Sequence, residues 1–413
     1  MKSRHVIIVG GGASGLVAAI ATARDGADVT IIEQKDRVGK KILSTGNGRC
    51  NLTNEYMNTE CFRGDDTTIV PQVLKQFGYE ETMSFFEDLG VLLKNRQGYI
   101  YPISDQASTV LDVLRMEIEH LSVQVVLEES VQHIKKTKKG FAVTTNHSTY
   151  FSDAVILATG GKASPVLGSD GSGYGLAKQL RHTISPVVPA LVQLIGKGNY
   201  FKQISGVRTN ATVNLYVDDV FAASDTGELQ LTNYGISGIP VFQISRYAAK
   251  ALYEKKQVTA SIDFLPTMTE EELNEFIQKR RQSQSYKTAE DFFVGMFHKK
   301  LIGMFLKIAK ISLNQAVETI LPKQWKQLLA LFKYFKVEIE GTNSFDQAQV
   351  CAGGVRTTEI NPETMESLYV DGLYLTGELL DIDGICGGYN LQWAWATGYI
   401  AGKNAAKTMA KGM

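Results

Sequence analysis

Cysteine is scarce in this chain, and its scarcity excludes several kinds of site. The four cysteines are Cys50, Cys61, Cys351 and Cys386, and none of them forms a C-x-x-C pair. The sequence therefore predicts neither a zinc ribbon nor a thioredoxin-like redox pair. We expect Cys50 to be a small buried side chain rather than half of a catalytic disulfide, because no second cysteine lies close to it in sequence. Sparse cysteine is typical of the reducing cytosol, so we expect a cytoplasmic protein.

An excess of one charge, long apolar runs and histidine clusters are also missing. Lys plus Arg and Asp plus Glu number 43 each, so charge predicts no nucleic-acid or membrane-surface partner. No apolar run reaches the roughly 18 to 20 residues that a membrane-spanning helix needs. Lys2 and Arg4 precede an apolar run that enters a glycine turn at once, so we expect no signal peptide. The histidines form no metal-binding pattern, and no metal site is expected.

The most informative segment that is present runs from Val6 to Glu33 and predicts a strand, a glycine turn, a helix and a second strand. Gly10, Gly12 and Gly15 form G-x-G-x-x-G directly after an apolar run. In this motif the first glycine permits the tight turn, the second lets the backbone approach a pyrophosphate, and the third lets the helix pack against the strand. Glu33 ends the second strand, about 20 residues further on, where a carboxylate accepts hydrogen bonds from a ribose. The segment predicts a dinucleotide site.

Two later segments indicate that the dinucleotide is FAD. Residues 376–398 predict a strand end, a loop with acids and a second helix that opens at Gly387-Gly388-Tyr389-Asn390. A helix N-terminus can stabilise the negative charge that a reduced flavin carries on its pyrimidine ring, and NAD has no such ring. Ala158-Thr159-Gly160 ends another apolar strand midway along the chain. Together these motifs resemble those of the two-dinucleotide-binding-domain flavoproteins of the glutathione-reductase superfamily.

The order of the segments predicts an α/β fold with a discontinuous Rossmann-like FAD-binding domain. Its parts are residues 1–189 and 345–413. Short β-like stretches predict a β-rich insert, the substrate domain, at 190–265 and 337–344, and residues 266–336 predict a small helical subdomain. We expect helices at 71–95, 107–120, 176–181, 237–252 and 391–409, and strands at 123–127, 131–135, 141–145, 153–157 and 368–375. Thr269 and Glu272 form a candidate capping box.

Three segments carry a narrower resemblance, namely residues 38–54, 231–246 and 348–402. The strings G-R-C-N-L-T-N and G-E-x-x-D-x-D-G-x-x-G-G-Y-N resemble signatures of the bacterial flavoproteins named after aminoacetone oxidase, also labelled YhiN- or BaiN-like. Where that family usually has S-G-G-G-R-C-N, this chain has T-G-N-G-R-C-N at 45–51. The resemblance covers nearly the whole chain. It implies FAD, a β-barrel-like insert with a helical subdomain and a cytosolic bacterial setting, and it implies the substrate only weakly.

The resemblance also implies where the cofactor lies. It places Gly10, Gly12, Ala13, Ser14 and Gly15 on the pyrophosphate, and Glu33, with Gln34 beside it, at the adenosine ribose. The remaining implied contacts are Lys41, Thr45, Gly46, Arg49, Cys50 and Asn51 along the flavin or its phosphates, Val131 at the adenine, Thr159 and Gly160 near the adenosine half, and Gly377, Glu378, Asp383, Tyr389, Asn390 and Leu391 around the ribityl chain and the edge of the flavin ring.

The sequence gives only weak signals for the substrate side. Tyr101 and Arg356 are candidates, although a packed tyrosine and a surface ion pair are the simpler interpretations. The histidines lie outside the cofactor signatures, so we expect no histidine acid or base. The chain lacks a second intact G-x-G-x-x-G for NAD(P)H, since the glycines at 168, 171 and 173 have the wrong spacing.

These signals predict an FAD-dependent oxidoreductase with a small-molecule substrate. The first hypothesis is an oxidase of a small amine such as aminoacetone, in which hydride passes to flavin N5 and O2 takes the electrons. The alternative is an NAD(P)H-dependent flavin reductase of an unsaturated or steroid-like substrate. A third hypothesis is a non-catalytic FAD-binding protein, or one that assists RNA modification, for which no basic footprint is present. The sequence leaves the oligomeric state open.

Overall fold

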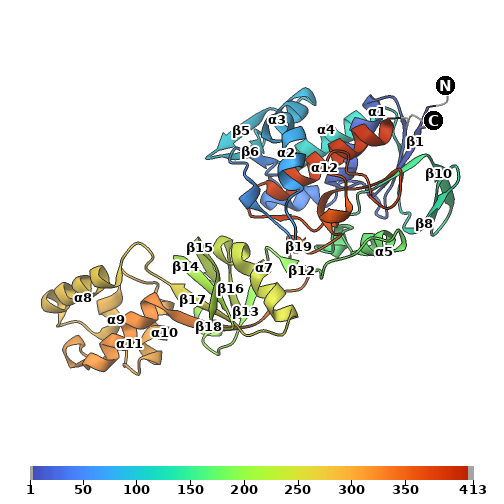
Figure 1. The fold of residues 1–413 in the computed structure, drawn as a ribbon. Coiled ribbons are helices and arrows are strands. Elements are labelled where there is room, and N and C mark those ends of the chain that lie inside the picture. Colours follow the sequence, from blue (N-terminus) through green and yellow to red (C-terminus); the bar gives the residue numbers. More distant parts are fainter. Residues whose placement is uncertain (1–2, 408–413) are drawn as a thin grey trace. The chain divides into compact units, whose positions relative to one another are not determined.

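The computed structural model describes residues 3–407, which divide into two compact units (Figure 1). The first unit holds the chain up to Val188 and from Ala348 onward, and the second holds Pro189–Gln347. Each unit has its own apolar core. Strands β12 (Val188–Ala190) and β19 (Val350–Ala352) lie where the chain leaves and re-enters the first unit.

A parallel sheet in the order β20-β11-β1-β2-β7 forms the centre of the first unit. Its strands are β1 (His5–Val9), β2 (Asp28–Ile32), β7 (Gln124–Val126), β11 (Ala154–Leu157) and β20 (Leu373–Leu375). Strand β1 pairs on one side with β11, Val6 opposite Ala154, and on the other side with β2, Val6 opposite Val29. The middle strands are almost wholly apolar because helices and loops bury both faces of such a sheet.

Helices α1 (Ala13–Arg24) and α12 (Tyr389–Ala406) pack directly against each other. A Cβ added to Gly398 would lie 2.3 Å from the carbonyl oxygen of Ser14, and one added to Gly402 would lie 2.5 Å from that of Ala18. Only glycine permits this approach, so the C-terminal helix is fixed against the helix that opens the dinucleotide motif. Helix α4 (Ala107–His120) has the predicted bounds and buries one apolar face, formed by Ala107, Val110, Leu111, Leu114 and Ile118.

Smaller elements surround this sheet. Five of them are short strands outside the central sheet: β3 (Thr53–Asn54), β4 (Phe62–Arg63), β5 (Leu93–Arg96), β6 (Tyr99–Pro102) and β21 (Asp383–Gly384). The other elements of this unit are α2 (Val70–Gln76), α3 (Tyr79–Asp88), β8 (Val131–Thr137), β9 (Gly140–Thr145), β10 (Thr149–Ser152) and α5 (Ser172–Gln179). Strands β3, β6 and β5 form one antiparallel sheet, and β4 pairs with β21.

Four predicted bounds in this unit were wrong. The single helical stretch at 71–95 is two helices, broken at Phe77 and Gly78, followed by strand β5. The helix expected at 176–181 is α5, which begins earlier because the carboxylate of Asp170 accepts the N–H of Ser172. The strand at 368–375 is only Leu373–Leu375, and α12 begins at Tyr389 rather than Leu391. The predicted end of that helix at 409 lies outside the described residues.

The second unit contains a closed barrel in the order β13-β16-β15-β14-β17-β18. Its strands are β13 (Leu194–Gly196), β14 (Arg208–Val217), β15 (Val220–Leu231), β16 (Gly235–Gly238), β17 (Val258–Asp263) and β18 (Phe335–Thr342). The helices of this unit are α6 (Phe201–Ile204), α7 (Ile239–Tyr253), α8 (Glu270–Gln284), α9 (Ala289–Phe293), α10 (Lys299–Ile308) and α11 (Pro322–Lys333). The predicted capping box is present, with Glu272 N–H donating to Thr269 Oγ1 at 3.2 Å. The predicted fold class is confirmed.

Candidate functional site

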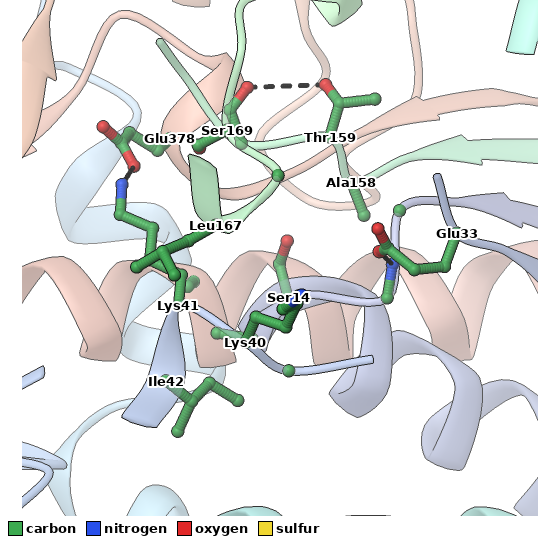
Figure 2. A pocket seen from close by; sticks show the side chains of 18 of the residues that line it. Ser14, Glu33, Lys40, Lys41, Ile42, Ala158, Thr159, Leu167, Ser169 and Glu378 are labelled. Carbon is green, nitrogen blue, oxygen red and sulfur yellow. Dashed lines mark hydrogen bonds and ion pairs between the residues drawn. The ribbon is translucent and has the colours of Figure 1, made fainter. Parts of the chain in front are cut away.

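A cavity opens at the carboxyl ends of strands β1, β2 and β11, above the N-terminus of helix α1 (Figure 2). It encloses about 1160 Å³, including space open to solvent. All of its lining residues belong to the first unit. This is the edge where parallel α/β sheets bind ligands, because the strand ends leave a crevice there.

The glycine turn has the geometry that its motif predicts. Gly10 has a φ of 101°, and a Cβ added to Gly15 would lie 2.0 Å from the Gly10 carbonyl oxygen, so both positions require glycine. A Cβ on Gly12 would meet no protein atom within 4 Å. Helix α1 has no side-chain cap and no acid in its first turn. Its free N–H groups and the positive end of its dipole therefore face the open part of the cavity, which suits a pyrophosphate.

Glu33 forms the wall beside this turn. It is only 8 % exposed, and its two carboxylate oxygens accept the N–H of Gly11 at 2.8 Å and of Lys35 at 2.9 Å. Burial raises the pKa of the Glu33 carboxyl, against the effect of these hydrogen bonds. The next residue, Gln34, donates to the carbonyl of Gly168 at 2.6 Å and so holds the glycine-rich loop over the cavity. Both residues line the cavity, where their polar groups could bind the adenosine half of a dinucleotide.

The opposite end of the cavity joins three segments that are far apart in sequence. Lys41 Nζ lies 2.8 Å from Glu378 Oε2, and Figure 2 shows this pair at the cavity wall. The other oxygen of Glu378 accepts the N–H of Cys351 at 2.8 Å. This arrangement places one cation and one anion at the cavity wall, the kinds of group that could bind phosphate and hydroxyl oxygens of a dinucleotide. It also ties the loop after β2 to the strand end at Glu378.

Helix α12 presents its N-terminus to the same end. Gly388 precedes the helix with a φ of 97°, and Asn390 locks the loop before it by bonding both the N–H and the carbonyl of Gly384. Asn390 and Leu391 line the cavity. Asn51 is buried nearby, and its Oδ1 has no hydrogen-bond partner within residues 3–407. The helix dipole and an unmatched amide oxygen fit a flavin ring edge, with its N–H group and its growing negative charge.

The structure brings most of the predicted cofactor residues to this cavity. Those that line it are Gly10, Gly12, Ala13, Ser14, Glu33, Gln34, Lys41, Thr45, Val131, Thr159, Gly160, Glu378, Asn390 and Leu391. The predicted residues outside its lining are Gly15, Gly46, Arg49, Cys50, Asn51, Gly377, Asp383 and Tyr389, which belong to the segments that support it. Asp383, for example, pairs with Arg63 in the ladder between β21 and β4.

The weaker candidates differ in position. Tyr101 packs beside the loop at 45–51, since a Cβ on Gly46 would lie 3.6 Å from its ring. Arg356 is exposed and precedes a short helical turn. Cys50 is fully buried, and burial raises the pKa of its thiol to about 12. It forms no disulfide within residues 3–407 and stays a neutral thiol, in agreement with the predicted packing role.

Sequence reasoning missed several lining residues. Arg37, Lys40 and Ile42 belong to the loop after β2, and Leu167 and Ser169 belong to the glycine-rich loop that Gln34 holds. Gln349 and Val350 line the flavin end. Closely spaced glycines at 168 and 171 marked one of these loops. Nothing local marks Gln349, because only the return of the chain to the first unit places it here.

Residues 3–407 contain neither a membrane-spanning helix nor a metal-binding cluster. No helix there is long and apolar enough to cross a membrane. No group of three or more His, Cys, Asp and Glu side chains in those residues could hold a metal ion.

Comparison with known proteins agrees with this geometry. The family described as "HI0933-like protein Rossmann domain" matches residues 4–404. A 3-dehydro-bile acid delta(4,6)-reductase of Clostridium scindens is 54 % identical over 97 % of this chain and 98 % of its own. A ribosomal RNA dihydrouridine synthase of Haemophilus influenzae is 28 % identical over 95 % of this chain and 96 % of its own. Among solved structures, a 3-ketosteroid delta1-dehydrogenase from Sterolibacterium denitrificans superposes with a TM-score of 0.51 at 11 % identity. The match covers 98 % of this chain and 100 % of that chain, and it supports the fold alone.

Proposed function

Because this chain belongs to the HI0933-like family of FAD-binding Rossmann flavoproteins, and is therefore an FAD-dependent oxidoreductase, we propose that it reduces a conjugated carbon–carbon double bond of a steroid-like ketone, with NAD(P)H as the electron donor. The observation that carries this proposal is the 54 % identity to a bile acid reductase along almost the whole of both chains. The relatives support this reductase better than the small-amine oxidase that was our first hypothesis.

The residues of the site divide the work of binding the cofactor. The N-terminus of α1 would hold the pyrophosphate, Glu33 would hold the adenosine ribose, and Lys41 and Glu378 would hold the chain that leads to the flavin. The N-terminus of α12 would stabilise negative charge at the flavin end. Bound FAD supplies the hydride chemistry, which no side chain of this protein can supply.

The substrate side needs a group that binds the ketone and a source for one proton. Reduction of the double bond adds one hydride and one proton, and oxidation of NAD(P)H balances the two electrons. Of the two substrate-side candidates, Tyr101 packs beside the loop at 45–51, whereas Arg356 lies exposed. Burial raises the pKa of Tyr101, so its phenol stays neutral at this edge of the site.

The test uses the purified FAD-loaded protein under anaerobic conditions. NADH or NADPH should bleach the flavin, and a bile acid with 3-oxo and delta(4,6) unsaturation should restore its colour while gaining H2 by mass spectrometry. Aminoacetone should leave the flavin oxidised. Bleaching by aminoacetone, with peroxide formed when air is admitted, would overturn the proposal in favour of the oxidase.

Ribosomal RNA enters the test as a competing substrate. One relative is named as a ribosomal RNA dihydrouridine synthase, and both relatives' names denote reduction of a carbon–carbon double bond. The lower identity to the RNA-acting relative favours the steroid-like substrate. Flavin reoxidation by ribosomal RNA, but not by the bile acid, would reverse that preference. A Gly12→Val variant, which should lose FAD, serves as the matched inactive control.

A further inference from the structure

A group of cationic and aromatic side chains shares one face of the small sheet formed by β3, β6 and β5. Lys94 lies opposite Tyr101, and Arg96 lies opposite Tyr99. Because side chains alternate along a strand, these four residues project from the same face. Ile100, on the other face, is fully buried. We call the four residues, together with Arg49, the Arg–Tyr face.

The Arg–Tyr face lies against the two segments that form the flavin end of the cavity. A Cβ on Gly46 would lie 3.6 Å from Cε1 of Tyr101, and one on Gly387 would lie 3.2 Å from Cε1 of Tyr99. Thr45, next to Gly46, lines the cavity, and so does Asn390 just after Gly387-Gly388-Tyr389. The face therefore lies against two segments whose neighbouring residues line the flavin end of the cavity, while its own residues stand outside that lining.

The charges on this face are not balanced. Lys94 Nζ at 2.5 Å and Arg96 Nη2 at 2.8 Å share one oxygen, Oδ2 of Asp105. The hydrogen bond from Lys94, supported by the charges of Arg96 and Arg49, lowers the pKa of Asp105, so that group stays ionised. Arg49 is exposed and makes no ion pair within the described residues. Three cations against one carboxylate leave two positive charges beside two tyrosine rings.

We propose that the Arg–Tyr face binds the carboxylate of an acidic substrate and thereby selects steroid acids over neutral steroids. The inference rests on the proposed function. An arginine fork binds a carboxylate through two parallel hydrogen bonds, and shared contact with Asp105 holds Lys94 and Arg96 in place for that role. The Arg96 guanidinium already lies 5.8 Å from the centre of the Tyr101 ring. The rings of Tyr99 and Tyr101 offer flat apolar surfaces for the hydrocarbon next to the charge.

The experiment compares an unsaturated 3-dehydro-bile acid with its methyl ester on the full FAD-loaded chain. In the wild type, the acid should have a KM about 10-fold lower than the ester, as a charged hydrogen bond predicts. Arg96→Gln should raise the KM of the acid to that of the ester. Arg208→Gln, which removes an exposed arginine of the barrel paired with Glu228, should change neither. Equal effects on acid and ester, or no effect of Arg96→Gln, would overturn the inference.

A binding measurement separates this inference from the proposed function. Cholate, a saturated bile acid, and its methyl ester can be measured by equilibrium dialysis without turnover. Cholate should bind more tightly than its ester, weaken with added salt and weaken about 10-fold in Arg96→Gln. Suppose that the enzyme reduces neither the unsaturated 3-dehydro-bile acid nor its methyl ester, but that cholate binds as described. The proposed reaction then fails and the carboxylate site stands. If the enzyme instead reduces the unsaturated acid and its ester equally well, and binds cholate and its ester equally well, the reaction stands and the carboxylate site fails.

Discussion

Replacing Gln392 by leucine tests how the flavin end of the site is held together. The side chain of Gln392 is fully buried in helix α12. Its Oε1 accepts the hydroxyls of Thr53 at 2.6 Å and Thr82 at 2.8 Å, and its Nε2 donates to the carbonyls of Phe77 at 3.0 Å and Gly78 at 3.1 Å. One amide thus joins helix α12, strand β3 and the break between α2 and α3.

Leucine has nearly the same volume but makes none of these bonds. Each buried polar group left without a partner costs about 1 kcal/mol or more, so Gln392→Leu should lower the free energy of unfolding of the first unit by about 3–4 kcal/mol. That is a large part of the 5–15 kcal/mol that stabilises a typical domain. The N-terminus of α12 loses its anchor at the same time, so FAD retention should fall as well.

Urea denaturation of the apoprotein, followed by tryptophan fluorescence, measures this loss. The chain has three tryptophans, and a Trp325→Phe background leaves Trp393 and Trp395 in α12 as reporters of the first unit. Gln278→Leu, on an exposed turn of α8, is the matched control and should change stability little. Adding Thr53→Val and Thr82→Val to Gln392→Leu should restore part of the loss. A Gln392→Leu protein within about 1 kcal/mol of the wild type would refute the reasoning.

The glycine turn, the acid after β2 and the buried thiols give three further expected outcomes. Gly15→Ala should destabilise the protein and lose FAD, because the new methyl group would lie 2.0 Å from the Gly10 carbonyl oxygen. Gly12→Ala should keep its stability and lose only FAD affinity, because its methyl group would meet no protein atom. Absorption spectra measure the bound FAD of each variant, and urea curves measure its stability. Glu33→Gln should weaken FAD binding about 10-fold, because its NH2 group would face the N–H of Gly11 or Lys35, and titration of apoprotein with FAD measures this. The unfolding free energy should fall by about 1.4 kcal/mol per pH unit above about pH 9 for each of Cys50 and Cys351. Burial raises both folded pKa values to about 12, so the unfolded thiols ionise first and the stability present below pH 9 is lost as pH rises.

Each of these outcomes has a matched control. Gly175→Ala adds a methyl group to open space in α5 and should behave as the wild type. Glu338→Gln, an exposed acid of the barrel, should leave FAD titration unchanged. A Cys50→Ala and Cys351→Ala double variant should lose the part of the alkaline slope that the two thiols cause. Alkaline curves of the same shape in both proteins would show that these thiols do not carry the effect.

Some corrections to the sequence reading have identifiable causes. Residues 71–95 were predicted as one helix, although the stretch contains Gly78. The break falls at Phe77 and Gly78, whose carbonyl oxygens accept hydrogen bonds from Gln392 in the distant C-terminal helix α12. Strand β5 follows because Gln97 and Gly98 both have positive φ, which makes the tight turn that joins it to β6. Only Gly98 gave a local signal of that turn.

Local sequence by itself determined the dinucleotide turn, the strands around it and the adenosine end of the site. These features depend on steric rules within a few residues, such as the need for glycine at positions 10 and 15. The family, and with it FAD, also followed from motifs that are contiguous in the chain. The predicted flavin contacts near Glu378 and Asn390 came from the same motifs, although nothing local fixed their partners.

Tertiary structure alone decided which distant residues meet at the flavin end. Lys41 bonds to Glu378, Gln392 joins Thr53 to Thr82, and Tyr101 lies against Gly46 on a face that carries Lys94 and Arg96. No local rule predicts the contacts of Glu378 and Gln392, because they depend on the close packing of α1 against α12, which brings the last part of the chain back to the first. The contact of Tyr101 with Gly46 likewise joins two segments that no local rule pairs. The proposed substrate side depends on such long-range contacts, and that is the physical reason why the sequence indicated the cofactor more readily than the substrate.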